Sequence, residues 1–255
     1  MAESWWQSFF DAQYLRLWSQ STTDAGTVEE ADFYWRTLGL APGSRVLDAP
    51  CGYGRIARVL ADRGAAVLGV DQSKELLEHA DRTRSGIGPD RLRYLLHDLR
   101  RPLAEGGFDA ALNVFSSIGY GEEEDDVAVL RTLARAVRSG GTVLVETLHR
   151  DTVAALLSRE APVASRLPDG TLMLEERRFD AIAGRVETTW HWQGPAGGGE
   201  KSALVRVYTV TELVRLVREA GLRFREALQS KTGTPFEGKG PLMGGRVTLL
   251  AERVA

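Results

Sequence analysis

The stretch Val46-Leu47-Asp48-Ala49-Pro50-Cys51-Gly52-Tyr53-Gly54 decides the fold of this chain. Its apolar start predicts a short strand that ends at Asp48, and its glycines predict a tight turn. Residues 56–61 follow with the helical spacing of apolar side chains. Glycines let a ligand approach the backbone closely, and the start of a helix offers free N–H groups. The stretch therefore predicts a strand–loop–helix unit that binds a ligand.

A second acidic residue stands where a ribose would need it. Residues 65–70 predict another apolar strand, and Asp71 ends it, 23 positions after Asp48. An acidic residue about 20 positions beyond a glycine loop is placed to accept hydrogen bonds from ribose hydroxyls. A tight turn without any ligand is the alternative for the loop alone. The loop, the acid and the strand–helix context together favour a nucleotide-like ligand.

Asp48 distinguishes this loop from a dinucleotide-binding loop. A dinucleotide loop places three glycines as G-x-G-x-x-G around a pyrophosphate, whereas here a carboxylate precedes the turn. That charge would repel a phosphate and suits a cationic ligand. S-adenosylmethionine (SAM), which combines a sulfonium and an ammonium with adenosine, has the required chemistry. A nucleotide-dependent dehydrogenase is the distant alternative.

Short apolar runs alternate with helical patterns through the first 150 residues. Strands are expected at 46–47, 65–70, 92–96, 110–115 and 142–146, and helices at 56–61, 74–82 and 122–137. Ser73 is expected to cap the second of these helices. This alternation predicts an α/β fold with a doubly wound, mostly parallel sheet.

Beyond His149 the pattern changes. Alternating segments at 172–179, 185–192 and 203–208 predict antiparallel strands, with a short helix at 152–157 before them and a turn at 194–199. A helix at 211–220 and strands at 222–228 and 245–251 complete the chain, with the loop 230–244 between the last two strands.

Five segments together carry a resemblance to one family: 46–54, Asp71, Asp98 in Leu96-His97-Asp98-Leu99, 108–115 and 137–144. They look like the first motif, the acid ending the second strand, the acid after the third strand, the fourth strand and the turn into the fifth strand of the class I SAM-dependent methyltransferases. The resemblance covers roughly residues 27–150 and resumes over 206–222. One departure is Pro50, which stands where most members have a glycine and has no N–H to donate.

The resemblance implies a fold and a set of cofactor contacts. The fold is a seven-stranded class I methyltransferase sheet with an N-terminal lid helix and an antiparallel insertion after the fifth strand. The resemblance also implies that the strand at 222–228 runs parallel to the first five. Asp71 is expected at the ribose, Asp98 at the adenine amino group, and the end of the fourth strand at the methionine part of SAM. The implied cofactor-binding residues are Tyr14, Asp48, Ala49, Pro50, Cys51, Gly52, Gly54, Asp71, Gln72, His97, Asp98, Leu99, Asn113 and Phe115.

The methyl acceptor is expected beyond the same ends of the strands. The predicted substrate-contacting residues are Tyr14, Phe115, Tyr120, His149, Arg150 and Phe236. His149 is the candidate catalytic base, because the unperturbed pKa of histidine lies near neutrality; a surface histidine without a role is the alternative. The His, Asp and Glu residues show no convincing metal-site spacing, so no metal is expected.

Two segments outside the central pattern are expected to cover the site. Trp6, Phe10, Tyr14 and Trp18 fall on one helical stripe, and the resemblance implies that residues 1–25 form a lid with Tyr14 reaching inward. A plain amphipathic helix packed on the domain is the alternative. The insertion 151–208 is expected to cover the substrate or to mediate self-association into a homo-oligomer.

Composition bounds the remaining possibilities. The 255 residues, with 32 Lys and Arg against 35 Asp and Glu, give a net charge of −3 and a single methyltransferase domain over 1–255. Nucleic-acid partners are disfavoured by that balance, and no apolar run is long enough to cross a membrane. The single Cys51 excludes an internal disulfide. With no signal-peptide pattern at the start, a cytoplasmic protein is expected.

These observations together predict a SAM-dependent methyltransferase that acts on N or O of a small molecule by direct displacement. The alternatives are a SAM-binding or regulatory protein without catalysis and a methyltransferase acting on a macromolecule.

Overall fold

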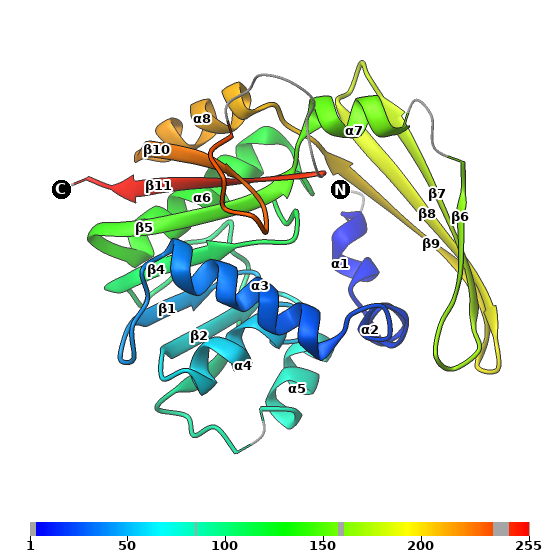
Figure 1. Ribbon diagram of the computed structural model, residues 1–255, viewed down its shortest axis with the longest axis horizontal. Helices are drawn as coiled ribbons and strands as arrows, with labels where there is room; N and C mark the ends of the chain where they lie inside the picture. The colour runs from blue at the N-terminus through cyan, green and yellow to red at the C-terminus, as the bar shows by residue number, and fades with distance from the viewer. Residues whose placement is uncertain (1–3, 85, 158–160, 237–244, 255) are drawn as a thin grey trace.

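The computed structural model describes residues 4–84, 86–157, 161–236 and 245–254 (Figure 1). Its centre is a seven-stranded sheet in the order β10-β11-β5-β4-β1-β2-β3. The strands are β1 (Arg45–Asp48), β2 (Ala66–Asp71), β3 (Leu92–Leu96), β4 (Phe108–Asn113), β5 (Val137–Leu148), β10 (Leu222–Gln229) and β11 (Arg246–Arg253).

Strand directions confirm the doubly wound α/β fold. β1 to β5 pair in parallel, whereas β11 runs antiparallel to β5 and β10 runs antiparallel to β11. β10 therefore has the direction of β5, as the sequence predicts. The carboxyl ends of β1, β2, β4, β5 and β10 consequently meet at one edge of the sheet.

Helices bury both faces of this sheet. They are α3 (Asp24–Thr37), α4 (Arg55–Asp62), α5 (Lys74–Arg82), α6 (Glu123–Ala136) and α8 (Val210–Glu219). Successive side chains of a strand point to opposite faces. Val46 accordingly packs with α3 and α4, whereas Leu47 packs with α6 and α8. Ser73 caps α5 by accepting a hydrogen bond from the Leu76 N–H, as predicted. The sequence pattern does not predict α3.

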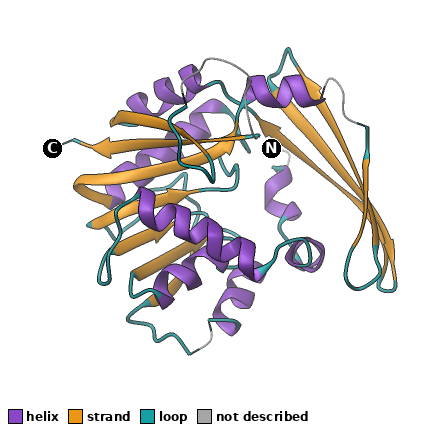
Figure 2. Cartoon of the chain, in the orientation of Figure 1, coloured by secondary structure: helices purple, strands orange, loops and turns teal. Residues whose placement is uncertain are grey.

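The insertion is a second, antiparallel sheet that α7 (Arg150–Leu157) connects to β5 (Figure 2). Its strands, in the order β6-β7-β8-β9, are β6 (Val163–Arg166), β7 (Leu172–Asp180), β8 (Arg185–Gly194) and β9 (Gly197–Arg206). The predicted turn at 194–199 is too long: Gly194 already pairs with Gly197, and Gly198 and Gly199 belong to β9. β6 is missing from the sequence prediction because its four residues carry no clear alternation.

The N-terminal aromatic stripe does not form one helix. It is split into α1 (Trp5–Phe9) and α2 (Ala12–Ser19). Asp11 begins the second helix, because its side chain accepts a hydrogen bond from the Tyr14 N–H and so satisfies a free donor of the first turn. Both helices lie between the two sheets (Figure 1). Phe9 and Leu17 pack there against Trp190 and Met173 of the insertion.

No helix in the described ranges is both long enough and apolar enough to cross a membrane.

Candidate active site

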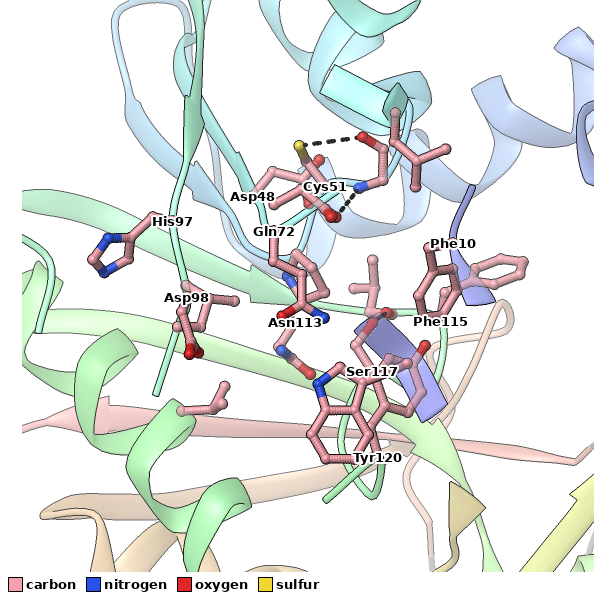
Figure 3. Close-up of a pocket in the computed structure, with 18 of the residues that line it drawn as sticks. Phe10, Asp48, Cys51, Gln72, His97, Asp98, Asn113, Phe115, Ser117 and Tyr120 are labelled. Carbon is pink, nitrogen blue, oxygen red and sulfur yellow. Dashed lines mark hydrogen bonds between the residues drawn. The ribbon is translucent and has the colours of Figure 1, made fainter. Parts of the chain in front are cut away.

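A cavity opens at the edge where the parallel strands end (Figure 3). Asp48 ends β1, Asp71 ends β2 and Asn113 ends β4, and all three line this first cavity. The other predicted residues that line it are Tyr14, Pro50, Cys51, Gly52, Gln72, His97, Asp98, Leu99, Phe115 and Tyr120. Ala49 and Gly54 stand beside it in the loop without lining it. The edge therefore gathers side chains from segments more than 100 residues apart.

The loop after β1 is held by backbone hydrogen bonds and a tight glycine. The Cys51 N–H donates to the Val70 carbonyl at 2.9 Å, and the Ala49–Pro50 peptide bond is cis. Gly54 begins α4 with φ +76°, and a Cβ there would overlap the Tyr94 hydroxyl. Glycine is therefore required at this position both for its backbone conformation and for the space it leaves.

Asp71 ties the loop to β2. Its carboxylate accepts hydrogen bonds from the Gly52 N–H at 2.8 Å and the Ser73 N–H at 2.9 Å. Burial raises the pKa of Asp71, and the backbone N–H groups oppose that rise. Each carboxylate oxygen can accept more than one hydrogen bond, so Asp71 retains acceptor capacity toward the cavity.

Asp48 is buried without a partner. It is 1% exposed, and neither of its carboxylate oxygens makes a hydrogen bond of ordinary geometry with the described residues. Burial raises the pKa of Asp48 to about 7, against the weaker opposing effects of Arg55 and of the nearby Ala57 backbone N–H. That guanidinium is itself paired with Glu30. A buried unpaired carboxylate is costly unless a positive or hydrogen-donating group meets it, so the wall of the cavity fits a cationic ligand at this point.

The end of the cavity beyond β3 carries a second acid. Arg100 contacts both oxygens of Asp98, with its Nη2 donating at 2.7 Å, and these hydrogen bonds lower the pKa of Asp98. The His97 Nε2 lies 3.0 Å from the Arg101 carbonyl. An ionised carboxylate beside Leu99 thus faces an otherwise mixed apolar and polar wall.

The segment after β4 is strained and clamped. Phe115 and Ser116 have φ values of +65° and +62°, a backbone region that side chains other than glycine rarely adopt. Two guanidinium groups contact the Phe115 ring, with the Cζ of Arg55 4.5 Å and the Cζ of Arg246 4.0 Å from its centroid. These cation–π contacts hold the ring in place. The Asn113 Nδ2 donates to the Ala49 carbonyl at 2.9 Å, which leaves its buried Oδ1 unpartnered.

A second cavity adjoins the first. It is bounded by α1, α2, α7, β7, β8 and β9, and its charged lining residues are Glu175, Arg177 and Arg246. Phe10, Tyr14, Trp18, Phe115 and Tyr120 line both cavities. These five residues, hereafter the shared wall, stand where the two cavities adjoin.

Three predicted residues do not reach either of these two cavities. His149 is 4% exposed; its Nδ1 lies 3.3 Å from the Thr152 hydroxyl, and its ring packs against Phe236. Burial lowers the pKa of His149. Arg150 points instead to Glu212, 3.7 Å away. The structure therefore does not bring His149, Arg150 or Phe236 to the cavity walls, and geometry gives no support to a base at His149.

Several lining residues escape sequence reasoning. Phe10 and Trp18 belong to the predicted aromatic stripe, but the stripe alone did not indicate that these two side chains line a cavity. Arg55 follows the glycine loop directly. Glu175, Arg177 and Arg246 carry no sequence signal, because only the pairing of distant strands places them at the second cavity. The searched residues contain no cluster of three or more His, Cys, Asp or Glu that could hold a metal ion.

Known proteins share this fold and this loop. The model of the methyltransferase domain family matches residues 46–141. The ubiquinone biosynthesis O-methyltransferase of Chromobacterium violaceum is 30% identical over 177 residues, which cover 67% of this chain and 70% of that protein. Alignments with other curated relatives cover as little as 46% of the relative.

Two solved structures superpose on nearly the whole chain. CcbJ methyltransferase from Streptomyces caelestis has a TM-score of 0.78 at 21% identity and covers 98% of this chain and 99% of its own. SAM-bound CalS10, an amino pentose methyltransferase from Micromonospora echinaspora, has a TM-score of 0.68 at 19% identity, covering 95% and 97%. The unpartnered carboxylate of Asp48 fits a cationic cofactor such as the SAM bound in CalS10. The chain belongs to the class I SAM-dependent methyltransferases.

Proposed function

We propose that this chain transfers a methyl group from SAM to a nitrogen atom of a small molecule. The first cavity is the donor site and the second cavity is the acceptor site. The observation that carries this proposal is the shared wall: the same five side chains line both cavities, so a donor and an acceptor in the two spaces would meet there.

Each of the three acidic residues at the donor site is proposed to contact a different part of the cofactor. Asp48 offers its unpaired carboxylate to the positive charge of the methionine part, Asp71 accepts from the ribose hydroxyls, and Asp98 accepts from the adenine amino group. The further contacts we propose are Tyr14, Ala49, Pro50, Cys51, Gly52, Gly54, Gln72, His97, Leu99, Asn113 and Phe115.

Alignment is the main work of the protein in this reaction. SAM supplies an electrophilic methyl group when bound. The shared wall holds the acceptor nitrogen in line with it, and such alignment alone lowers a barrier substantially. A nitrogen–carbon bond forms as the carbon–sulfur bond breaks, and the product ammonium then loses a proton to water. The aromatic rings of α1 and α2 exclude bulk water from the meeting point.

The second cavity favours nitrogen over oxygen as the acceptor atom. A hydroxyl acceptor usually needs a base, and no histidine is found among the described residues that line this cavity. Its one carboxylate, Glu175, is committed to Trp190 and Arg177. Burial raises the pKa of Tyr120 to about 12, so that hydroxyl stays protonated at neutral pH. A neutral amine needs no base.

The second candidate is methyl transfer to a hydroxyl. It is favoured by relatives named as ubiquinone biosynthesis O-methyltransferases. In either case we propose that residues 1–25 act as a lid and that the insertion 151–208 covers the acceptor. The packing of α1 on the four-stranded sheet supports this, because Lys201 of β9 donates to the Phe9 carbonyl at 2.9 Å.

A screen for SAM consumption tests the proposal. Small amines, phenols and sugars would be incubated with methyl-labelled SAM, and labelled product would be separated and identified. We expect turnover with an amine, and loss of turnover in Asp71→Asn but not in Asp81→Asn, an exposed control on α5. Turnover with phenols alone would favour the hydroxyl candidate. Tight SAM binding with no turnover on any class would favour a non-catalytic SAM-binding protein, and turnover only on RNA or protein would sink the small-molecule claim.

A further inference from the structure

The second cavity has an unusual wall. Rings and aliphatic side chains make up most of it, among them Trp5, Phe10, Trp190 and Leu148. Tyr14 and Trp18 stack nearly parallel to Trp190, at interplanar angles of 7° and centroid distances of 6.0 and 5.6 Å. Parallel rings of this kind favour a flat apolar body that stacks beside them.

The one carboxylate among the described residues that line this cavity, Glu175, already has partners within the protein. The Glu175 side chain is 14% exposed, and its Oε2 accepts a hydrogen bond from the Trp190 Nε1 at 2.8 Å. Its Oε1 forms an ion pair with Arg177, whose side chain is 48% exposed. Glu175 therefore orients a ring and a guanidinium and offers little free charge to a ligand.

Among the described residues, in contrast, Arg246 keeps N–H groups that are free to bind a ligand. Its Nη1 contacts the Glu146 Oε1 at 3.2 Å, while the other oxygen of Glu146 accepts from the Tyr34 hydroxyl. Glu146 is 4% exposed and lines neither cavity, so the carboxylate stands behind the guanidinium. Within the described part of the chain, the Arg246 Nε and Nη2 have no hydrogen-bond partner.

Arg246 lies where its guanidinium can contact a ligand in the second cavity. Its guanidinium lies 4.0 Å from the Phe115 ring and so stands at the shared wall, where the two cavities meet. A guanidinium held by a buried carboxylate is pre-organised, and its free N–H groups match the planar oxygens of a carboxylate, sulfonate or phosphate.

We propose that the second cavity is an acceptor subsite for a flat apolar molecule that also carries an anionic group. Arg246 pairs with the anion, and the Trp190 side takes the apolar body. This subsite rests on the proposed function for its role in methyl transfer, but its binding chemistry can be measured without knowing the acceptor.

A matched pair of fluorescent probes tests this subsite. 8-Anilino-1-naphthalenesulfonate is a flat aromatic anion, and N-phenyl-1-naphthylamine has the same aromatic body without the sulfonate. Each would be titrated into the full chain saturated with S-adenosylhomocysteine, which keeps the donor site filled. We expect the anionic probe to bind at least tenfold more tightly than the neutral one.

Three variants show where the preference comes from. Arg246→Met is expected to reduce the ratio of the two dissociation constants to below threefold, and Arg246→Lys to retain part of it. Arg223→Met, which removes an exposed arginine of β10 paired with Glu252, is expected to leave it unchanged. Equal binding of the two probes, or an unchanged ratio in Arg246→Met, would overturn the subsite.

A second titration, in which S-adenosylhomocysteine is added to ligand-free chain that holds the anionic probe, separates the subsite from the proposed function. If S-adenosylhomocysteine displaces the anionic probe, the probe occupies the donor cavity and the subsite is refuted. If S-adenosylhomocysteine itself fails to bind, the proposed function fails as well. Normal cofactor binding combined with a lost probe preference refutes the subsite alone.

Discussion

The proposed chemistry of the first cavity can be tested most directly at Asp48. Its folded-state pKa of about 7 stands above the ordinary value of 3.8. The ligand-free folded protein therefore binds this proton more tightly than the unfolded chain does. It follows that the contribution of Asp48 to stability is most favourable below about pH 4 and is lost as the pH rises to about 7.

Replacing Asp48 by Asn removes that loss. We expect Asp48→Asn to stabilise the ligand-free protein at pH 8, by an amount on the order of 4 kcal/mol at most, since one pKa unit corresponds to about 1.4 kcal/mol. Denaturant unfolding of both proteins at pH 5 and pH 8 measures the effect. The gain should shrink at pH 5. A gain that is equal at both pH values, or a loss at pH 8, would show that Asp48 is not a strained carboxylate.

Cofactor binding should make the ionised form of Asp48 more stable than the protonated form that the ligand-free protein favours. A positive charge beside the carboxylate favours its ionised form, so SAM binding at pH 6 is expected to release a proton. Calorimetric titrations in two buffers of different ionisation enthalpy count the protons released. Asp48→Asn should release fewer and bind SAM more weakly. Identical proton release in the two proteins would place the cofactor charge elsewhere.

Residues that line the first cavity could be predicted because their signals are local. Asp48, Gly52 and Asp71 stand at fixed distances from apolar runs, and the loop geometry follows from the sequence around them. Arg246 and Glu146 are 100 positions apart and meet only through the pairing of β11 with β5. No spacing rule reaches that far. His149 was predicted from its chemistry, but burial beside Phe236 turns it away from the cavities.

At the scale of elements, one lysine holds the corner between α1 and α2, the two helices of the proposed lid. Lys201 of β9 donates to the Ser8 and Phe9 carbonyls and to the Asp11 carboxylate, at 3.3, 2.9 and 2.8 Å. It therefore caps the end of α1 and holds the start of α2 at the same time. The sequence predicts one continuous helix here because the apolar period runs through the corner; the capping preference of Asp11 outweighs it.

We expect Lys201→Met to loosen this corner. Loss of hydrogen bonds from a charged donor, with a side chain that is 14% exposed, should destabilise the fold by about 1–3 kcal/mol. It should also speed the release of S-adenosylhomocysteine. Urea unfolding and stopped-flow tryptophan fluorescence measure the two effects. Lys74→Met, which removes a lysine that is 73% exposed, is the control and should change neither. An unchanged release rate in Lys201→Met would argue against the lid.

A second device fixes the loop between β4 and α6. The Tyr208 hydroxyl donates to the Asp126 Oδ2 at 2.5 Å, and the Asp126 Oδ1 accepts from the Gly119 N–H at 2.9 Å. Burial raises the pKa of Asp126 to about 6. At Gly119, with φ +102°, an added Cβ would overlap the Arg206 carbonyl. These contacts set the position of neighbouring Tyr120 in the shared wall.

Tyr208→Phe leaves the Asp126 carboxylate with one partner fewer. We expect a destabilisation of about 1–3 kcal/mol at pH 8, where that buried carboxylate is ionised, and a smaller one at pH 5, where it is mostly protonated. Denaturant unfolding at the two pH values measures the difference. The double variant with Asp126→Asn serves as the control and should lose the pH dependence. Equal losses at both pH values in Tyr208→Phe alone would contradict this account.

At the scale of the whole molecule, the sequence predicts the parallel sheet but not how the N-terminal helices pack beside it. Alternating apolar runs and helical periods are local patterns that predict a doubly wound sheet, whereas the direction of β10 was expected from the family resemblance. The antiparallel insertion was also predicted. The place of the N-terminal helices between the two sheets was not, because Trp190 and Met173, which pack against them there, lie 156 to 181 residues away from Leu17 and Phe9 in sequence.

The central claim is that two cavities meet at one shared wall, with the donor site on the side of Asp48. The most direct measurement is a crystal structure of the chain with S-adenosylhomocysteine. We predict its amino group near Asp48, its ribose at Asp71 and its sulfur facing the shared wall at Phe115 and Tyr120. A ligand lying in the second cavity, or a sulfur turned away from that wall, would contradict the account.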